Sequence, residues 1–510
     1  MHVAHLVGEY WPFARTGGLA EAVRGIATFQ AASGTPTDVF MPLYRVARES
    51  APDLVQACED VEVTLGGGRV ERCRVLRKER PPAGPVTYFV DHPGFFDRAG
   101  IYGEGGSDYP DNHLRFATFV RAVLAALPRL VTDRVVLHPH DWHTALAAVY
   151  LRTVLKGDPF YDAVACVLSV HNAGYQGLYG PGVLEEVGLP ASLFHWGALE
   201  YYGQANWLKG GLAFADWVTT VSPTHAHELR TPAGGFGLHD FFIAMGDRLV
   251  GILNGIDVEL WDPSADPDIP ARYTPEDLSG KLVCKKHLQE AVGLPVDPEV
   301  PLVGMTARLA KQKGFDLILQ DGLLHRLPDA QFVFLGEGDP HYRHLLQVVA
   351  EHAPERVAAF FEFTERREHV LLAGADILLM PSQYEPCGLT QMRAQRYGAL
   401  PVVRRVGGLS DTVDDQETGF VFDEFTSHAL EVALRRAFDL FPKRAAWERH
   451  MRAAMARDFG WARSAERYLD LYRNALEAHP LRSLANAGPN TGGAPTASPG
   501  PAAKVPATTS

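Results

Sequence analysis

The sequence contains little cysteine, no excess of positive charge and no long apolar run, and each absence excludes a class of protein. The five cysteines are scattered and form no CxxC pair, which favours buried, reduced thiols and a cytoplasmic location. A net charge of −13 argues against nucleic acid or an anionic membrane as a partner. No run approaches the roughly 18 apolar residues of a membrane span. No basic leader precedes the first expected strand, so we also expect no signal peptide.

Length and hydrophobic pattern indicate two domains of roughly 200–250 residues each. Apolar strand candidates alternate with helical segments in two series. The first series comprises 2–8, 37–42, 86–91, 134–139, 163–170 and 217–222, and the second 301–306, 331–336, 357–363, 375–380, 400–403 and 419–423. This alternation predicts an α/β fold of two doubly wound, Rossmann-like domains that face each other across a cleft. Ligands of such sheets bind beyond the carboxyl ends of the strands.

The stretch 381–413, PSQYEPCGLTQMRAQRYGALPVVRRVGGLSDTV, follows one of these strands and has the features of an anion site. We expect a helix to begin at Gly388, where the N–H groups of Gly388, Leu389 and Thr390 would be unpaired and would attract an anion. The adjacent carboxylate of Glu385 favours a ligand that also carries hydroxyl groups, such as a nucleotide sugar. The alternative is a solvated loop glutamate before an ordinary surface helix.

The segment 138–143, HPHDWH, ends another expected strand and admits three interpretations. Three histidines and an aspartate could bind a metal, but the intervening proline and tryptophan match no recognised ligand spacing. Asp141 and Trp142 could instead form a sugar pocket, with a hydroxyl acceptor and an apolar face. In the third interpretation the histidines only satisfy backbone groups at the strand end.

Two cations follow the first strand of the second series. In GMTARLAKQKG, Arg308 and Lys313 could both point into the cleft, where contacts to a desolvated phosphate are strong. Surface arginine and lysine residues are common, so this segment alone does not decide between a phosphate site and a solvated loop.

The blocks EPCGLTQ and RYGALPVVRRVGGLSDTV resemble the donor site of bacterial glycogen synthases and plant starch synthases, which are retaining glucosyltransferases with the GT-B fold. Further blocks match in the same order, and the resemblance covers nearly the whole chain to about residue 478. It implies ADP-glucose as the donor and an α-1,4-glucan such as glycogen as the acceptor.

The resemblance assigns the donor side residue by residue. The spacing R-L-x-x-Q-K-G matches the family's diphosphate-binding block, with Arg308 and Lys313 as its cations. Phe363 takes the place of an aromatic residue, usually tyrosine, that stacks on adenine. In the turn RTGGL, Gly17 and Gly18 match a glycine pair of the family, whereas Arg15 replaces the usual lysine with a planar, forked cation.

The resemblance also implies an acceptor side. The segment SVHNAGYQG resembles the family's TVHNxxxQG, which places His171 against the transferred glucose. The loop 95–116 resembles the acceptor-facing loop, and HPHDWH resembles the family's HxHDW. The acceptor and sugar-binding residues so implied are Tyr102, Asn112, Asp141, Trp142 and Asn172.

We divide the chain accordingly. Residues 1–248 are expected to form the N-terminal, acceptor-side domain and 249–460 the C-terminal, nucleotide-sugar domain. A helix at 461–479 is expected to cross back onto the first domain. The tail 480–510 consists mainly of Pro, Ala, Gly, Ser and Thr, so we expect it to be disordered.

We therefore predict a hexosyltransferase that transfers glucose from ADP-glucose to the non-reducing end of an α-1,4-glucan with retention. The catalytic set is Glu385, His171, Arg308, Lys313 and Asp141. No cofactor and no metal are expected, because no Asp-x-Asp block stands at a plausible diphosphate position and protein cations replace the metal. The alternatives are a related enzyme that uses UDP-glucose or a small acceptor, and a glucan-binding regulatory homologue without turnover. We identify no sequence pattern that predicts the oligomeric state.

Overall fold

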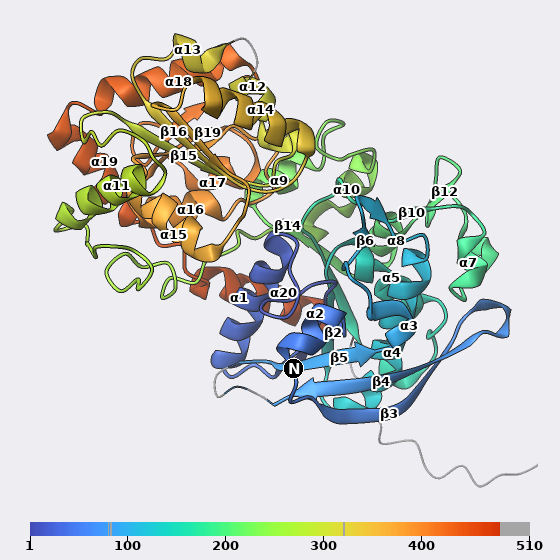
Figure 1. Cartoon of the computed structure of the whole chain (residues 1–510). Helices are drawn as coiled ribbons and strands as arrows, with labels where there is room; N and C mark the ends of the chain where they lie inside the picture. The colour runs from blue at the N-terminus through green and yellow to red at the C-terminus, as the bar shows by residue number, and fades with distance from the viewer. Residues whose placement is uncertain (80, 82–83, 320–321, 480–510) are drawn as a thin grey trace, which may run out of the picture.

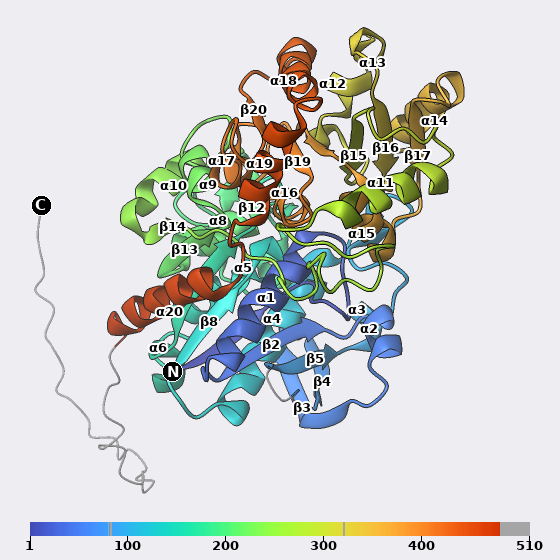
Figure 2. The ribbon, with the colours of Figure 1, turned by 90° about the vertical axis from the view of Figure 1, so that its left-hand side faces the viewer.

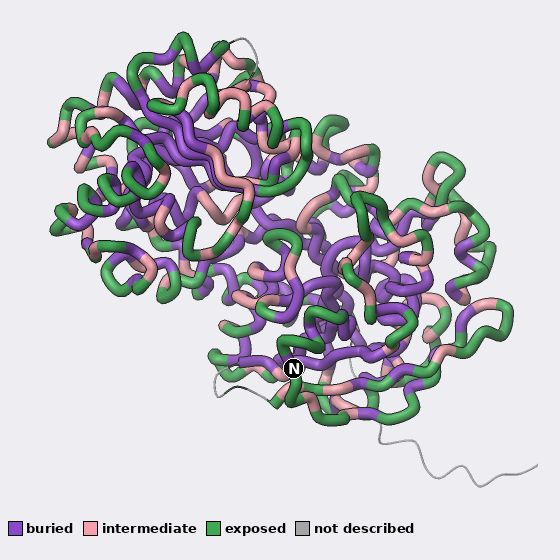
Figure 3. Tube along the Cα trace, in the orientation of Figure 1, coloured by how far each residue is buried: buried purple, intermediate pink, exposed green. Residues whose placement is uncertain are grey.

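A computed structural model describes residues 1–79, 81, 84–319 and 322–479 of the chain (Figure 1). The predicted tail therefore lies outside the described residues. Two sheets, each covered by helices, form the centres of two α/β domains. In both domains the central strands of the sheet are buried and the outer helix faces are exposed (Figure 3).

The N-terminal sheet has nine strands in the order β14-β13-β9-β8-β1-β2-β5-β4-β3. Its strands are β1 (His2–Leu6), β2 (Thr37–Pro42), β3 (Val55–Thr64), β4 (Val70–Lys78), β5 (Val86–Asp91), β8 (Val135–Pro139), β9 (Ala165–Val170), β13 (Trp217–Thr220) and β14 (Leu249–Gly251). Its helices are α1 (Gly18–Ala32), α2 (Arg45–Ser50), α3 (Pro93–Phe96), α4 (Asn112–Leu130), α5 (Asp141–Arg152), α6 (Pro159–Asp162), α7 (Val183–Glu186), α8 (Trp207–Phe214), α9 (Pro223–Glu228) and α10 (His239–Met245).

The predicted parallel strands of the first series are all present, but the sheet also contains three strands that were not predicted: parallel β14 and antiparallel β3 and β4. Strands β3 and β4 form a long hairpin that adds to the edge of the sheet through β5. Exposed and buried residues are mixed along both strands, because part of the hairpin faces solvent. It therefore lacks the continuous apolar run by which the other strands were recognised.

The C-terminal sheet has six parallel strands in the order β17-β16-β15-β18-β19-β20. They are β15 (Leu302–Thr306), β16 (Gln331–Leu335), β17 (Val357–Phe360), β18 (Ile377–Met380), β19 (Leu400–Arg404) and β20 (Phe420–Phe422). The helices are α11 (Ser279–Ala291), α12 (Phe315–Leu319), α13 (Leu323–Arg326), α14 (Pro340–His352), α15 (Glu365–Gly374), α16 (Thr390–Arg396), α17 (Gly407–Thr412), α18 (Ser427–Leu440) and α19 (Arg444–Met455). Along β18, Ile377 and Leu379 join one core cluster and Leu378 and Met380 another, so both faces of the sheet are buried.

Helix α20 (Ala462–Glu477) follows the C-terminal domain but packs on the N-terminal one, against α1, β8 and β9 (Figure 2). Gly25 of α1 leaves room for Trp461, because a Cβ at Gly25 would lie 2.0 Å from the indole nitrogen. The two chain segments that connect the domains lie side by side, since Ile256 N–H donates to the carbonyl of Phe459 at 2.8 Å. Strand β14 belongs to the first sheet, which thus extends three residues beyond position 248.

The two domains also touch at the ends of their strands. Ser222 caps α9 by accepting from His225 N–H at 3.1 Å, and its hydroxyl donates to the carbonyl of Pro386 in the other domain at 2.7 Å. Arg393 of α16 forms an ion pair with Glu21 of α1. In the described part of the chain, no helix is both long and apolar enough to span a bilayer.

Candidate active site

The carboxylate of Glu385 lies in the turn after β18 and is held by two donors. Its Oε2 atom accepts from Lys313 Nζ at 2.6 Å and from the Ser382 hydroxyl at 2.9 Å. The residue is 7% exposed. Oε1 has no protein partner within the described chain, so the turn presents one free carboxylate oxygen in a fixed orientation.

Two glycines allow the backbone to approach this turn closely. A Cβ at Gly407 would lie 2.0 Å from the Glu385 carbonyl oxygen, and the N–H of Gly408 donates to that same oxygen at 3.1 Å. From the other side, Gln312 Nε2 donates to the carbonyl of Tyr384 at 2.9 Å. The glycine pair and the lysine loop thus both fix the position of the Glu385 side chain.

The expected helix start after Glu385 requires a correction. Helix α16 begins at Thr390, with Leu389 as its N-cap, because Gly388 has a φ of +71° and cannot belong to the helix. A Cβ at Gly388 would also lie 2.4 Å from the Gln391 amide oxygen. The N–H groups of Gly388, Leu389 and Thr390 donate to no acceptor among the described residues, so this short segment still offers unpaired donors.

Arg308 follows β15 and carries an unpaired charge. Its side chain is exposed and forms no ion pair with any carboxylate in the described ranges. It lies close enough to Tyr384 that its charge opposes the rise that burial causes in the pKa of that tyrosine. Arg308 and Lys313 therefore both stand beside the turn that carries Glu385.

Phe363 and Arg15 meet at the junction of the two domains. Phe363 follows β17, and its N–H donates to Glu337 at 2.8 Å. The guanidinium of Arg15 lies 5.8 Å from the Phe363 ring centre and 4.7 Å from that of Trp11, and it pairs with Glu21. The structure thus places Arg15 beside the ring expected to stack on adenine; its contact with phosphate stays a prediction.

The Gly17-Gly18 turn faces the donor-side segment across the domain junction. A Cβ at Gly18 would lie 3.9 Å from a methyl group of Leu389, and nothing lies within 4 Å of one at Gly17. The buried carboxylate of Glu9 organises this turn, because it accepts from the Thr16 hydroxyl at 2.7 Å and from Gly17 N–H at 3.3 Å.

Asp141, His171 and Asn172 come together at the ends of β8 and β9. Asp141 Oδ1 accepts from His171 N–H at 2.7 Å and from Asn172 N–H at 3.4 Å. Burial raises the pKa of Asp141 to about 7, against the lowering effect of these two N–H groups. Its φ of +56° is uncommon for a residue other than glycine and marks local strain at the site. The Asn172 side chain interacts with the Tyr384 hydroxyl of the other domain.

Three other predicted acceptor-side residues are engaged by the protein itself. Asn112 is 2% exposed, and its amide donates to the Tyr102 carbonyl at 2.9 Å and accepts from Arg115 at 2.6 Å. The Tyr102 hydroxyl donates to Glu9 at 2.8 Å. Trp142 is 8% exposed and packs on Gly177. These side chains shape the loop wall, and direct sugar contacts from them stay predictions.

Comparison with known proteins places this geometry in a family. The profile described as "Starch synthase catalytic domain" matches residues 2–244, and "Glycosyl transferases group 1" matches residues 289–453. A glycogen synthase of Anaeromyxobacter dehalogenans is 44% identical over 93% of this chain and 99% of its own. One from Syntrophotalea carbinolica is 41% identical over 94% of this chain and 100% of its own.

The chain belongs to the glycogen and starch synthase family.

Solved structures agree with the family and give the fold. The catalytic domain of Arabidopsis thaliana starch synthase IV, bound to ADP and acarbose, superposes with a TM-score of 0.84 at 32% identity, covering 93% of this chain and 99% of that one. A sucrose-phosphate synthase of Thermosynechococcus elongatus, at 18% identity and a TM-score of 0.58, covers 94% of this chain and all of its own and supports the fold alone. The predicted family and the predicted GT-B fold are thereby confirmed, and the chain is a glycosyltransferase.

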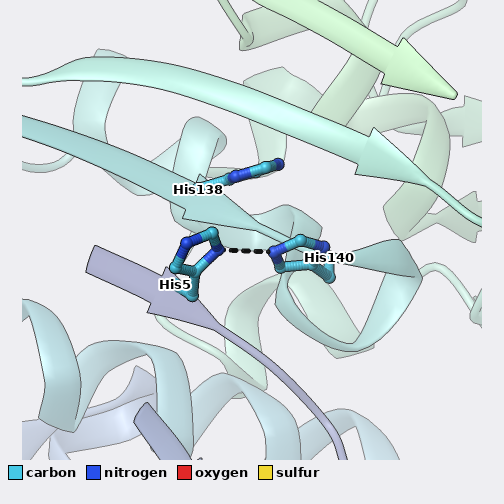
Figure 4. A group of neighbouring side chains, drawn as sticks. All are labelled: His5, His138 and His140. Carbon is cyan, nitrogen blue, oxygen red and sulfur yellow. Dashed lines mark hydrogen bonds between the residues drawn. The ribbon is translucent and has the colours of Figure 1, made fainter. Parts of the chain in front are cut away.

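The histidines of this family member form a buried cluster that resembles a metal site. The nearest ring nitrogens of His5, His138 and His140 lie within 4.8 Å of one another (Figure 4). All six ring nitrogens, however, already have partners, including Tyr472 and Ser169 at 2.7 Å from His138. A metal would have to displace several of these bonds, so the donor set fits a hydrogen-bond network better than a coordination sphere.

Sequence reasoning missed three residues of the site. Glu9 orients the glycine turn and Tyr102, Ser382 holds Glu385, and Tyr384 contacts Asn172 from the opposite domain. A carboxylate directly after a buried strand was a usable signal for Glu9. Ser382 and Tyr384 stand inside the donor block but gave no signal of their own, because their partners become visible only in three dimensions.

Proposed function

We propose that this protein is a glycogen synthase that transfers glucose from ADP-glucose to the non-reducing end of an α-1,4-glucan with retention of configuration. The observation that carries the proposal is the Lys313–Glu385 pair at 2.6 Å beside the unpaired Arg308 and the free N–H groups after Glu385. The Arabidopsis starch synthase IV domain, similar over 93% of this chain, was solved with ADP and acarbose.

In the proposed reaction, cations of the protein stabilise the departing ADP. Arg308 and Lys313 would contact the diphosphate, and the N–H groups of Gly388, Leu389 and Thr390 would donate to its oxygens. Such preorganised donors stabilise charge that develops in the transition state and need no reorganisation when the bond breaks. Phe363 offers a ring face for the adenine.

Glu385 would bind the transferred sugar from the same turn. Its Oε2 is engaged by Lys313 and Ser382, so its free Oε1 accepts a sugar hydroxyl. The negative charge lies where an oxocarbenium-like sugar gains positive charge, which lowers the barrier electrostatically. We assign Glu385 this role and do not assign it a covalent intermediate.

The N-terminal domain would complete the pocket. His171 would lie against the transferred glucose, and Asp141 holds the His171 backbone at 2.7 Å and keeps a second carboxylate oxygen for a hydroxyl group. We accordingly propose residues 1–248 as the acceptor-side domain, 249–460 as the donor domain, and a cytoplasmic location for the enzyme.

One assay tests the proposal. The protein is incubated with glycogen and either ADP-glucose or UDP-glucose, and release of the nucleoside diphosphate is followed. Transfer from ADP-glucose onto glycogen is the expected result. Faster turnover with UDP-glucose, or with maltose in place of glycogen, would instead favour a related enzyme. No turnover with any pair would favour a glucan-binding homologue.

A further inference from the structure

A chain of hydrogen bonds runs from the sugar-facing histidine into the interior of the N-terminal domain. His171 Nε2 lies 2.9 Å from His140 Nδ1, His140 Nε2 lies 3.0 Å from His5 Nδ1, and His5 Nε2 lies 2.9 Å from the amide oxygen of Gln30. The link between His5 and His140 is visible in Figure 4. His5, His140 and Gln30 are each no more than 1% exposed, so water does not compete for these bonds.

All three imidazoles are neutral near pH 7. Burial lowers the pKa of His5 to about 4, that of His171 to about 3, and that of His140 well below its ordinary value. A neutral imidazole carries one N–H donor and one acceptor nitrogen. Each ring in the chain must therefore donate on one side and accept on the other.

The amide of Gln30 sets the direction of the chain. Its oxygen only accepts, so His5 must donate from Nε2 and accept at Nδ1. His140 must then donate from Nε2 to His5, and His171 must donate from Nε2 to His140. Every proton position follows from the one acceptor at the buried end.

Helix α20 fixes the orientation of that amide. The nitrogen of Gln30 donates to the Tyr472 hydroxyl at 3.2 Å, and this hydroxyl lies 2.7 Å from His138 Nδ1. His138 Nε2 in turn lies 2.7 Å from the Ser169 hydroxyl. Because the Gln30 nitrogen donates to the Tyr472 hydroxyl, the amide oxygen faces His5, and the single proton of Tyr472 is left to donate to His138 Nδ1.

We infer that Gln30 and Tyr472 are positioning residues that hold His171 in its Nε2–H tautomer, so that Nδ1 presents only a lone pair to the sugar. No described residue bonds to His171 Nδ1, which leaves that nitrogen available. A nitrogen with only a lone pair accepts a hydrogen bond and cannot donate one. The network therefore fixes the direction of this contact: the sugar hydroxyl donates and His171 Nδ1 accepts. The inference rests on the proposed role of His171 at the transferred glucose.

The tautomer is read directly in the ligand-free protein. Histidine is labelled with ¹⁵N, and two-bond ¹H–¹⁵N correlation spectra are recorded, with a His171→Asn variant for assignment. A neutral Nε2–H ring at His171 is the expected result. An Nδ1–H ring would overturn the inference, and so would one equivalent of metal bound to the purified protein.

Substitution of Gln30 then tests the network by activity. Gln30→Leu removes the acceptor and is expected to mix the His171 tautomers and lower kcat/KM for ADP-glucose by about tenfold or more, as loss of an orienting partner does elsewhere. Gln30→Glu should restore both, because a buried glutamic acid that keeps its proton donates and accepts like the amide. Gln289→Leu, at a fully buried glutamine of the other domain, controls for general damage.

The outcomes separate the two proposals. If Gln30→Leu stays folded and within twofold of the parent, the network does not position His171. If Gln30→Leu fails to fold, the spectrum of the parent still decides. If the parent transfers no glucose from any donor, the proposed function fails, whereas the tautomer measurement tests the network independently.

Discussion

Asp141→Asn tests whether the buried carboxyl group titrates within the working pH range of the enzyme. Asparagine keeps the shape and the acceptor oxygen for the N–H groups of His171 and Asn172, at 2.7 and 3.4 Å in the parent. It also tolerates the left-handed backbone at φ +56° better than most residues. The substitution therefore removes the titration and leaves the geometry nearly unchanged.

The direction of the effect on stability follows from the two pKa values. In the unfolded chain Asp141 loses its proton near its ordinary value of 3.8, whereas burial in the folded protein raises the pKa to about 7. Between these values the folded state binds more protons than the unfolded state, so stability falls as pH rises through this window and levels off above it. At about 1.4 kcal/mol per pH unit, the parent loses at most about 4.5 kcal/mol of stability across the window.

Urea unfolding of both proteins from pH 5 to pH 8 measures the effect. The parent should lose stability with rising pH relative to Asp141→Asn, whose curve lacks this contribution. In parallel, kcat/KM of the parent should rise with a midpoint near pH 7, because the ionised carboxylate accepts a stronger hydrogen bond from a sugar hydroxyl than the protonated form does, and Asp141→Asn should lose that rise. Asp240→Asn, at a side chain that is 87% exposed, is the matched control. Parallel pH curves for the parent and Asp141→Asn would refute the reasoning.

Three further predictions concern the domain junction. Glu385→Ala should keep the fold but lose about a hundredfold or more in kcat; near-parental turnover would remove Glu385 from the mechanism. Arg15→Ala should lower kcat/KM about ten- to a hundredfold, as expected for a charge-assisted bond, while Arg15→Lys keeps most activity; an alanine variant within twofold would make Arg15 a surface residue. Small-angle scattering with and without ADP and acceptor should show a smaller radius of gyration when both bind; an unchanged radius at proven saturation would argue against closure.

The sequence predicted what depends on local patterns. The parallel strands of the two predicted series were found because each is a short apolar run between helical segments. The donor turn was found because Glu385 and the glycines after it lie within one stretch of chain. The start of α16 was misplaced by two residues because the left-handed conformation of Gly388 is not visible in the sequence.

The rest of the site depends on contacts between residues that are far apart in the chain. The hydrogen bond between Gln30 and Tyr472 joins residues 442 positions apart, and nothing in the sequence around either residue predicts this contact. The histidines of segment 138–143 were considered as metal ligands, and only the placement of β1 beside β8 shows that His5 is a hydrogen-bond partner of His140. Such contacts depend on which strands and helices are neighbours in space. The residue pattern indicates the strands and helices but not which of them lie side by side.

The paired connections between the domains have a mechanical consequence. Because the segments around Ile256 and Phe459 are bonded to each other at 2.8 Å, both covalent links between the domains lie along one line. A rigid domain that is attached along a single line moves by hinge rotation about that line, and the part of the domain farthest from the axis is displaced most. A small change of angle at the connections is therefore amplified with distance from the axis. Ligands that bridge the two domains far from that line would control the rotation with the greatest leverage.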